Sequence, residues 1–311
     1  WNHRYNYELA KQVKAINPDV LIVFGGPEVA ITDPKLFVDN PFMDLVICYE
    51  GEITFKRVLK AFESRDWETV PGLLINRNGE AVKTEDAERI ETLEEVPSPY
   101  LSGIFDDLIA KHPEITWQGT LETNRGCPFA CTFCDWGGTT YSKIKKFEFD
   151  RVFAELKWAS DHKIEYIFVA DANFGIFAER DKEISKEVAR LKQLTGYPQY
   201  VSVTWNKNAK LGVIEIAKIL GSRGLTVSMQ SMDDKVLEEI KRKNMDMSNL
   251  AELLPECERA QVPVYTELIL GMPYETKQTW RNGHYKLLDY KQHAMLEVYL
   301  TMLDRKSTRL N

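Results

Sequence analysis

A regular alternation of apolar runs and amphipathic helical patterns constrains the fold of this 311-residue chain more than any other feature. Such repetition predicts a parallel sheet whose strands are joined by right-handed helical crossovers. Six strands can form an open barrel and fall short of the eight in a closed (β/α)8 barrel. The expected strands are Thr120–Thr123, Tyr166–Ala170, Tyr200–Trp205, Leu225–Met229, Val264–Leu270 and Leu296–Met302. The expected helices are Asp150–Ser160, Arg180–Leu194, Val213–Leu220, Asp234–Lys241 and Met247–Ala260.

Polar residues recur at every second position of four of these strands. Because successive strand residues face opposite sides of a sheet, each set shares one face. Strands buried on both faces would be apolar throughout, so the stripes predict a wet lumen that holds ligands. The alternative is that these strand faces are simply exposed. The sets are Ser202, Thr204 and Asn206; Thr226, Ser228 and Gln230; Tyr265 and Glu267; and Glu297, Tyr299 and Thr301.

The first part of the chain predicts half of a doubly wound α/β domain. Helix Tyr7–Ala15 precedes the apolar run Val20–Phe24, which ends at two glycines where open α/β sheets bind ligands. Leu45–Cys48 is a second buried run, and it leads through a turn into a helix over Ile53–Phe62. Asn78-Gly79 is typical of the turn of a β-hairpin. The expected hairpin strands are Gly72–Ile75 and Ala81–Lys83.

These patterns divide the chain into three parts. We expect a partial α/β domain over 1–84, an acidic and irregular linker over 85–117, and the barrel over 118–311. We also expect that further elements of the first domain precede Trp1 and that the last barrel helix is missing. The tail Lys306–Asn311 has no apolar helical pattern, and we expect that it is not native sequence.

Three of the five cysteines, Cys127, Cys131 and Cys134, lie within eight residues in a C-x3-C-x2-C pattern just after the first barrel strand. Thiolates bind iron–sulfur clusters, zinc or copper(I). Structural zinc takes four ligands, usually as two separated pairs, and no histidine follows this loop before His162. A [4Fe–4S] cube held by three cysteines leaves one iron open to a substrate or cofactor. Cys48 and Cys257 are interpreted as buried structural cysteines.

This loop resembles the signature of the radical S-adenosylmethionine (radical SAM) superfamily, in which an aromatic residue, here Phe133, precedes the third cysteine. The segments Ala170–Gly175, Met229–Met232 and Leu270–Thr276 resemble the family's second, fourth and fifth strand ends. The resemblance implies a (β/α)6 radical SAM barrel that binds a [4Fe–4S] cluster and S-adenosylmethionine (SAM). It implies SAM or pocket contacts by Phe133, Asp171, Asn173, Asn206, Gln230, Ser231, Glu267 and Gly271.

In that setting, Asp171 is expected to accept a hydrogen bond from the SAM ammonium, while Gln230 and Ser231 are expected to bind hydroxyl groups. Asp171 or Ser231 could instead cap the helix that follows its strand. Arg242 could face the SAM carboxylate, but a solvated arginine at a helix end is the favoured interpretation.

The partial domain resembles the Rossmann-like cobalamin-binding domain of one large class of radical SAM proteins. The resemblance rests on Gly25-Gly26-Pro27-Glu28, Tyr49-Glu50-Gly51-Glu52, the hairpin and Pro97-Ser98-Pro99-Tyr100. It implies that the loops containing Gly25, Gly26, Glu50 and Gly51 hold cobalamin. The sequence has no Asp-x-His-x-x-Gly loop for a lower cobalt ligand, and a scaffold without cofactor is the alternative. No G-x-G-x-x-G is present for a dinucleotide.

Together these features predict a radical SAM enzyme that cleaves SAM to a 5′-deoxyadenosyl radical and, in the cobalamin class, methylates an unknown substrate. The alternatives are cyclisation, oxidation or sulfur insertion without cobalamin, and a non-enzymatic, zinc-stabilised binding module. The expected partners are a small-molecule or peptide substrate and an electron donor such as flavodoxin or ferredoxin.

Charge and hydropathy limit the other partners. The net charge of −7 disfavours nucleic acid and anionic membrane surfaces as partners. The sequence has no apolar run long enough to span a bilayer and no signal peptide at its start, so we expect a cytoplasmic protein.

Overall fold

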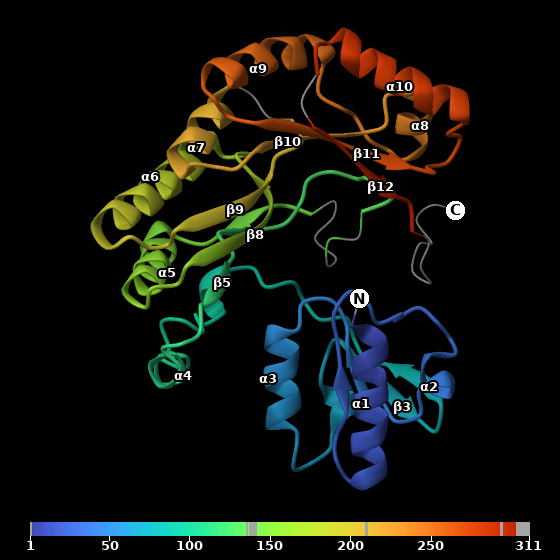
Figure 1. The fold of residues 1–311 in the computed structure, drawn as a ribbon. Helices are drawn as coiled ribbons and strands as arrows, with labels where there is room; N and C mark the ends of the chain where they lie inside the picture. The colour runs from blue at the N-terminus through green and yellow to red at the C-terminus, as the bar shows by residue number, and fades with distance from the viewer. Residues whose placement is uncertain (1, 135, 137–141, 209–210, 293–294, 303–311) are drawn as a thin grey trace.

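The structure is a computed structural model that describes residues 2–134, 136, 142–208, 211–292 and 295–302. It has a smaller unit that contains the first four strands and a larger unit in which helices form an arc outside a curved layer of strands (Figure 1). Within the described part of the chain, no helix is both long and apolar enough to cross a membrane. The tail Lys306–Asn311 lies outside the described residues, so the expectation about it stays untested.

The smaller unit is a four-stranded sheet in the order β1-β2-β3-β4. Strands β1 and β2 are parallel, while β3 is antiparallel to both β2 and β4. The predicted hairpin is confirmed, because Asn78 and Gly79 both have positive φ, as a two-residue type I′ turn requires. The elements are α1 His3–Ile16, β1 Val23–Phe24, α2 Leu36–Asp39, β2 Leu45–Ile47, α3 Glu52–Lys60, β3 Leu73–Arg77 and β4 Glu80–Lys83.

Strand β1 is shorter than the apolar run Val20–Phe24 predicts. The side chain of Asp44 accepts a hydrogen bond from the Ile22 amide at 2.7 Å and also pairs with the Lys14 ammonium. The Ile22 N–H is therefore used by a side chain, and regular pairing with β2 begins only at Val23.

The larger unit contains the six predicted strands, all parallel within two three-stranded sheets, β5-β8-β9 and β10-β11-β12. The backbone ladder is interrupted between β9 and β10, but one continuous hydrophobic core joins the two sheets. The strands are β5 Gln118–Leu121, β8 Tyr166–Phe174, β9 Tyr200–Trp205, β10 Leu225–Gln230, β11 Val264–Leu270 and β12 Met295–Leu300. The helices are α5 Phe149–Asp161, α6 Ala178–Thr195, α7 Gly212–Leu220, α8 Asp234–Glu239, α9 Met247–Arg259 and α10 Lys277–Asp289.

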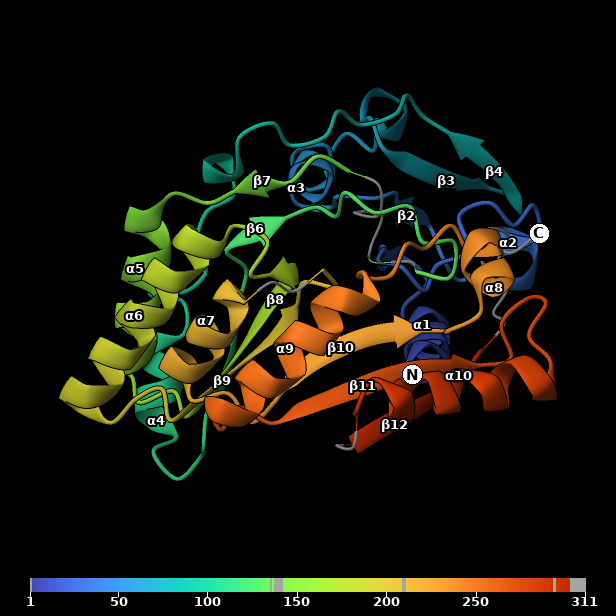
Figure 2. The same ribbon diagram turned by 90° about the horizontal axis from the view of Figure 1, so that it is seen from above.

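The polar stripes follow the face of the sheet opposite the helices. In β10, Leu225, Val227 and Met229 are buried, whereas Thr226 and Ser228 are partly exposed. Seen from above, α5, α6, α7, α9 and α10 lie outside the strands (Figure 2). The prediction of a polar inner face is thus confirmed for this strand, and its buried side supplies the hydrophobic core.

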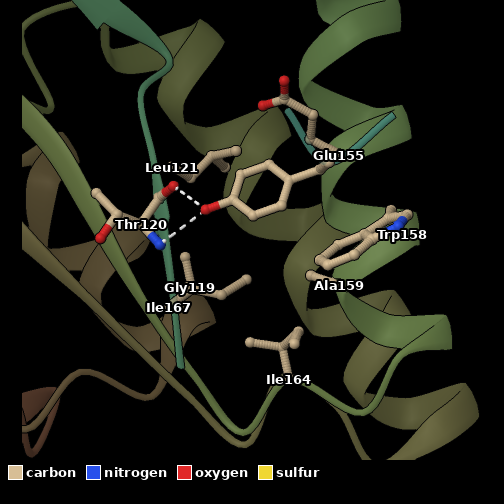
Figure 3. A pocket seen from close by; sticks show the side chains of 9 residues that line it. Gly119, Thr120, Leu121, Glu155, Trp158, Ala159, Ile164 and Ile167 are labelled. Atoms are coloured by element: carbon tan, nitrogen blue, oxygen red, sulfur yellow. Dashed lines mark hydrogen bonds between the residues drawn. The ribbon is translucent and has the colours of Figure 1, made fainter. Parts of the chain in front are cut away.

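The structure also contains elements that the sequence patterns did not predict. Helix α10 follows β11, and the connector after residue 84 contains the short helix α4 Asp106–Lys111. The connector is held on the barrel by Tyr100, whose hydroxyl accepts a hydrogen bond from the Thr120 amide at 3.1 Å and donates to the Thr120 carbonyl at 2.5 Å (Figure 3). The Tyr100 ring also packs on Trp158, with ring centroids 4.9 Å apart.

Candidate functional site

The cysteine loop, residues 126–142, begins and ends at a short ladder between β6 Asn124–Arg125 and β7 Lys145–Lys146. Just beyond this ladder, the Cys127 carbonyl accepts a hydrogen bond from the Ser142 amide at 2.7 Å. Farther along, the Thr132 amide donates to the Ile240 carbonyl at 3.0 Å, which joins the loop to the end of α8. None of the three cysteines of the motif takes part in a disulfide, and Cys131 is buried.

Nitrogen donors from three segments distant in sequence, the end of β8, the loop after β9 and the loop after α8, approach the cysteine sulfurs. Asn173 Nδ2, at the end of β8, lies 3.4 Å from Cys127 Sγ. Lys207 Nζ and Arg242 Nη1 lie 3.6 Å and 3.9 Å from Cys131 Sγ. These polar and cationic donors suit sulfurs that carry negative charge, as cluster-bound thiolates do.

The loop therefore fits a [4Fe–4S] cluster, in which each thiolate binds a different iron. Among the residues with described positions, no three His, Cys, Asp or Glu side chains are arranged to hold a single metal ion.

Arg242 corrects one interpretation made from the sequence, because it is not a solvated arginine at a helix end. Arg242 is only 8% exposed. Its guanidinium also donates to Asn244 Oδ1 at 2.9 Å and to the Ser228 carbonyl. Burial lowers the pKa of Arg242, and the thiol of Cys131 opposes that shift.

Lys207 was not predicted at all. Burial likewise lowers the pKa of its ammonium. Its position one residue after Asn206, at a strand end that was predicted to face the lumen, is the only sequence signal that could have indicated it.

Asp171 braces the start of the cysteine loop. Its fully buried carboxylate accepts hydrogen bonds from the Thr123 amide (2.7 Å) and hydroxyl (2.5 Å), and from the Asn124 amide (3.1 Å) and side-chain Nδ2 (2.6 Å). With two donors on each oxygen, its acceptor positions are filled. The structure thus gives Asp171 a bracing role, and its expected contact with the SAM ammonium stays a prediction.

Gln230 and Ser231 lie buried at the end of β10, where Gln230 has a φ of +64°. The Ser231 hydroxyl accepts a hydrogen bond from the Asp233 amide at 3.3 Å, and the Asp233 side chain in turn accepts from two amides at the start of α8. Ser231 thus contacts the turn before α8, while Asp233 and not Ser231 caps the helix. Contacts of Gln230 and Ser231 with SAM stay predictions.

The remaining predicted pocket residues lie at or near the carboxyl ends of the strands. Asn206 is buried after β9, and Glu267 of β11 accepts a hydrogen bond from Ser228 at 2.6 Å. Gly271 has a φ of +94°, and its amide donates to Glu275 at 2.6 Å. Phe133 packs in a small apolar cluster that also contains Met272. The cysteine loop therefore contacts the segment that follows β11.

In the smaller unit, the turns after β1 and β2 meet beside Ile47. A Cβ added at Gly25 or at Gly51 would lie 3.7 Å from Ile47 side-chain atoms. Gly26 is exposed with a φ of +93°, and no atom lies within 4 Å of the Cβ position there. These three glycines form an open edge that fits a bulky ligand.

Glu50 does not lie on this edge. Its carboxylate accepts from Arg89 Nε at 3.3 Å and from the Ile90 amide at 3.2 Å, and it pairs with Arg125 Nη1 at 3.3 Å. These ionic partners hold the Glu50 side chain against the connector and the cysteine loop, and a contact of Glu50 with cobalamin stays a prediction.

Gly126 is expected to be irreplaceable at the start of the cysteine loop. Its φ is +124°, and a Cβ there would lie 2.7 Å from the Lys143 carbonyl oxygen, so both backbone strain and a clash oppose Gly126→Ala. We expect the variant to retain less than half of the iron that the wild-type chain binds after reconstitution. Gly196→Ala is the matched control, because Gly196 also has positive φ but open space around it. Equal iron content in both variants would contradict the prediction.

Asp181 is expected to make stability depend on pH. It is fully buried beside Arg180, Lys146 and Asp171, and burial raises its pKa to about 6. Between about pH 4 and pH 6, the folded state therefore binds more protons than the unfolded state, and the free energy of unfolding falls as pH rises. Asp181→Asn removes this effect, so the variant should gain about 3 kcal/mol relative to wild type between pH 4 and pH 7. Urea unfolding across that range would measure it, with the exposed Asp161→Asn as control. If the free energy of unfolding changed with pH in the same way in wild type and in Asp181→Asn, the prediction would be refuted.

The model of the radical SAM superfamily matches residues 121–282, which is half of the chain. The chain belongs to the radical SAM superfamily. Its fold is a partial (β/α)6 radical SAM barrel preceded by a partial Rossmann-like unit. This membership leaves the zinc-stabilised binding module without support.

Two curated proteins illustrate the relationship within the superfamily. The chain is 39% identical over 307 residues to the cobalamin-dependent radical SAM methyltransferase TokK of Streptomyces tokunonensis, with 96% of this chain and 45% of that protein covered. It is 38% identical, with the same coverage, to the 2-(S-pantetheinyl)-carbapenam-3-carboxylate methyltransferase of Streptantibioticus cattleyicolor. The chain thus spans about half the length of these relatives.

A solved structure shares the fold of both units. The radical SAM methyltransferase TsrM of Kitasatospora setae, solved with cobalamin and a [4Fe–4S] cluster, superposes with a TM-score of 0.71 at 16% identity. The match covers 95% of this chain and 57% of TsrM. At this identity, the likeness shows the fold alone.

Proposed function

We propose that this chain belongs to a radical SAM methyltransferase that uses cobalamin. Cys127, Cys131 and Cys134 would bind three irons of a [4Fe–4S] cluster. When bound, the reduced cluster and SAM supply a 5′-deoxyadenosyl radical, and cobalamin supplies the methyl group. The observation that carries the proposal is the approach of nitrogen donors from three segments distant in sequence to two cysteine sulfurs.

The residues around the loop have distinct tasks in this proposal. Lys207 and Arg242 would offset the charge of the cluster-bound thiolate of Cys131. Asp171 would hold the loop at the strand ends by its four hydrogen bonds. Gln230, with Asn206 and Glu267, would line the space for SAM and substrate and orient their polar groups.

The cobalamin part of the proposal concerns the smaller unit. We assign residues 1–84 to a cobalamin-binding-type domain, 85–117 to the connector and 118–311 to the barrel. The open glycine edge after β1 and β2, together with the names of the two curated relatives, supports this assignment. Gly25, Gly26 and Gly51 would let the backbone approach the cofactor.

We also propose the partners of the reaction. The substrate would be a small molecule, and a flavodoxin or ferredoxin would deliver the electron that reduces the cluster. A cytoplasmic location is part of the same proposal, since cysteines that bind a cluster must stay reduced, and the cytosol keeps thiols reduced.

Anaerobic reconstitution of the chain with iron and sulfide tests the proposal. We expect the broad visible absorbance of a [4Fe–4S] cluster, and 5′-deoxyadenosine after addition of SAM and dithionite. A methylated product is expected only when cobalamin is also present, with 2-(S-pantetheinyl)-carbapenam-3-carboxylate as the first probe.

Each negative result has a separate meaning. Formation of 5′-deoxyadenosine without cobalamin binding would favour cyclisation, oxidation or sulfur insertion instead of methyl transfer. Failure to assemble a cluster would refute the enzyme proposal as a whole.

A further inference from the structure

The base of the cysteine loop is tied to the smaller unit and the connector through both of its strands. From β6, the Arg125 guanidinium binds the Glu122 carboxylate with two hydrogen bonds at 2.9 and 2.8 Å and Glu52 Oε1 at 2.8 Å. From β7, the Lys145 ammonium donates to the Ile90 carbonyl. Figure 2 shows β7 beside α3, the helix that begins at Glu52.

Glu50 is the second centre of this network, and its side chain is only 14% exposed. One carboxylate oxygen faces Arg125 Nη1, and the other faces Arg89 Nε and the Ile90 amide. Burial by itself would raise the pKa of Glu50, but the hydrogen bonds from Arg89, Arg125 and Ile90 lower it below its usual value. The carboxylate is thus held ionised between three segments that are distant in sequence.

Arginine suits this position better than lysine. Its planar guanidinium presents five donors in a fixed fork, whereas an ammonium is a compact point charge. Arg125 uses that fork to contact three carboxylates while its side chain is only 12% exposed. The hydrogen bonds that Arg125 donates to the Glu122 carboxylate raise the pKa of Arg125 above its usual value.

Arg125 connects the cysteine loop directly to the turn after β2. Arg125 stands two residues before Cys127, and Glu50 and Glu52 flank Gly51 in the turn after β2. We propose that Arg125 is a positioning residue that sets the distance between the three cysteines and the turn Tyr49–Glu52. Given the proposed function, it thereby sets the distance between the cluster and the cobalamin held beside that turn.

The ion pairs of Arg125 with Glu50 and Glu52, here called the ionic tie, can be tested without any cofactor. The measurement is hydrogen exchange of the chain in three variants. In Arg125→Met we expect the amides of residues 51–60 and 122–127 to exchange at least tenfold faster than in wild type. Arg125→Lys should recover part of this protection, because one ammonium still reaches one or two of the carboxylates. The matched control is Arg190→Met, because Arg190 forms only an exposed ion pair with Glu187.

If the ion pairs connect the two segments, a change on either side should affect hydrogen exchange on the other side, whereas a local loss of structure would not. Glu50→Gln, on the opposite side, should speed exchange in residues 122–127, and its effect should not add to that of Arg125→Met in the double variant. Wild-type exchange across both segments in Arg125→Met would overturn the proposal. Additive effects of the two variants would also overturn it.

Electron paramagnetic resonance tests the distance between the cluster and the cobalamin. The sample is the reconstituted chain with cob(II)alamin and dithionite. In wild type, the reduced cluster should accelerate the spin relaxation of cob(II)alamin, because the dipolar interaction depends steeply on distance. Arg125→Met should weaken or broaden that effect while the iron content and the cobalamin content stay at wild-type levels. Unchanged relaxation would refute the positioning role. If the wild-type chain binds no cob(II)alamin, the proposed function and the cobalamin half of this inference fail, and hydrogen exchange alone decides the ionic tie.

Discussion

Alanine at Cys127, Cys131 or Cys134 is expected to abolish assembly of the iron–sulfur cluster. Each thiolate of a three-cysteine site binds a different iron, so two thiolates leave a second iron without a protein ligand. The loop itself should persist, because its base is held by β6, β7 and the hydrogen bonds of Asp171. Iron and sulfide content, visible absorbance and 5′-deoxyadenosine formation are the measurements. All three should fall below detection in each variant.

The chain offers its own controls in Cys48 and Cys257. Both are buried in hydrophobic clusters, and burial raises the pKa of the Cys48 thiol and raises that of Cys257 to about 11. Such thiols behave as small apolar side chains. Cys48→Ala and Cys257→Ala should bind iron like wild type and lose about 1 kcal/mol of stability. Loss of iron in either control, or retention of a full cluster by Cys131→Ala, would contradict the assignment of ligands.

Asp171→Ala is expected to be the most destabilising single change around the loop. It leaves the donors of Thr123 and Asn124 buried without their acceptor, and each unsatisfied buried donor costs about 1–3 kcal/mol. We expect a loss of about 4 kcal/mol in the free energy of unfolding, allowing for local relaxation. The midpoint of urea denaturation measures it. Iron binding should fall too, because the residues that precede Gly126 lose their brace.

Two further variants define the cause. Asp161→Ala removes an exposed carboxylate that pairs with Lys157, and it should change stability by less than about 0.5 kcal/mol. Asp171→Asn keeps the shape of the side chain but turns an NH2 group toward two donors, so it should also destabilise strongly. If Asp171→Asn were as stable as wild type, the four hydrogen bonds would not be the source of the effect.

Much of the fold followed from local patterns. The period of apolar residues predicted β9 and β11 at their observed bounds and most helices to within two residues, because each pattern reports which face of an element is buried. Helix α10 escaped prediction because its buried side consists of little more than Gly283 and Leu287. Val20–Phe24 was predicted to be too long a strand, because the Asp44 side chain takes the Ile22 amide, and no local pattern reports that contact.

For the functional site too, some features were visible in the sequence and others only in the tertiary structure. The sequence by itself determined the three cysteines, because all of them lie in one short loop and their spacing is visible without a fold. Only the tertiary structure decided which charges face them. Lys207 and Arg242 are 76 and 111 residues away from Cys131, and they reach its sulfur because the loop after β9 and the loop after α8 both pack against the cysteine loop. Only the tertiary structure showed, likewise, that Asp171 braces the cysteine loop and that Glu50 pairs with Arg125. Whether a carboxylate faces a ligand or a neighbouring loop depends on long-range packing, which residue type and local spacing do not encode.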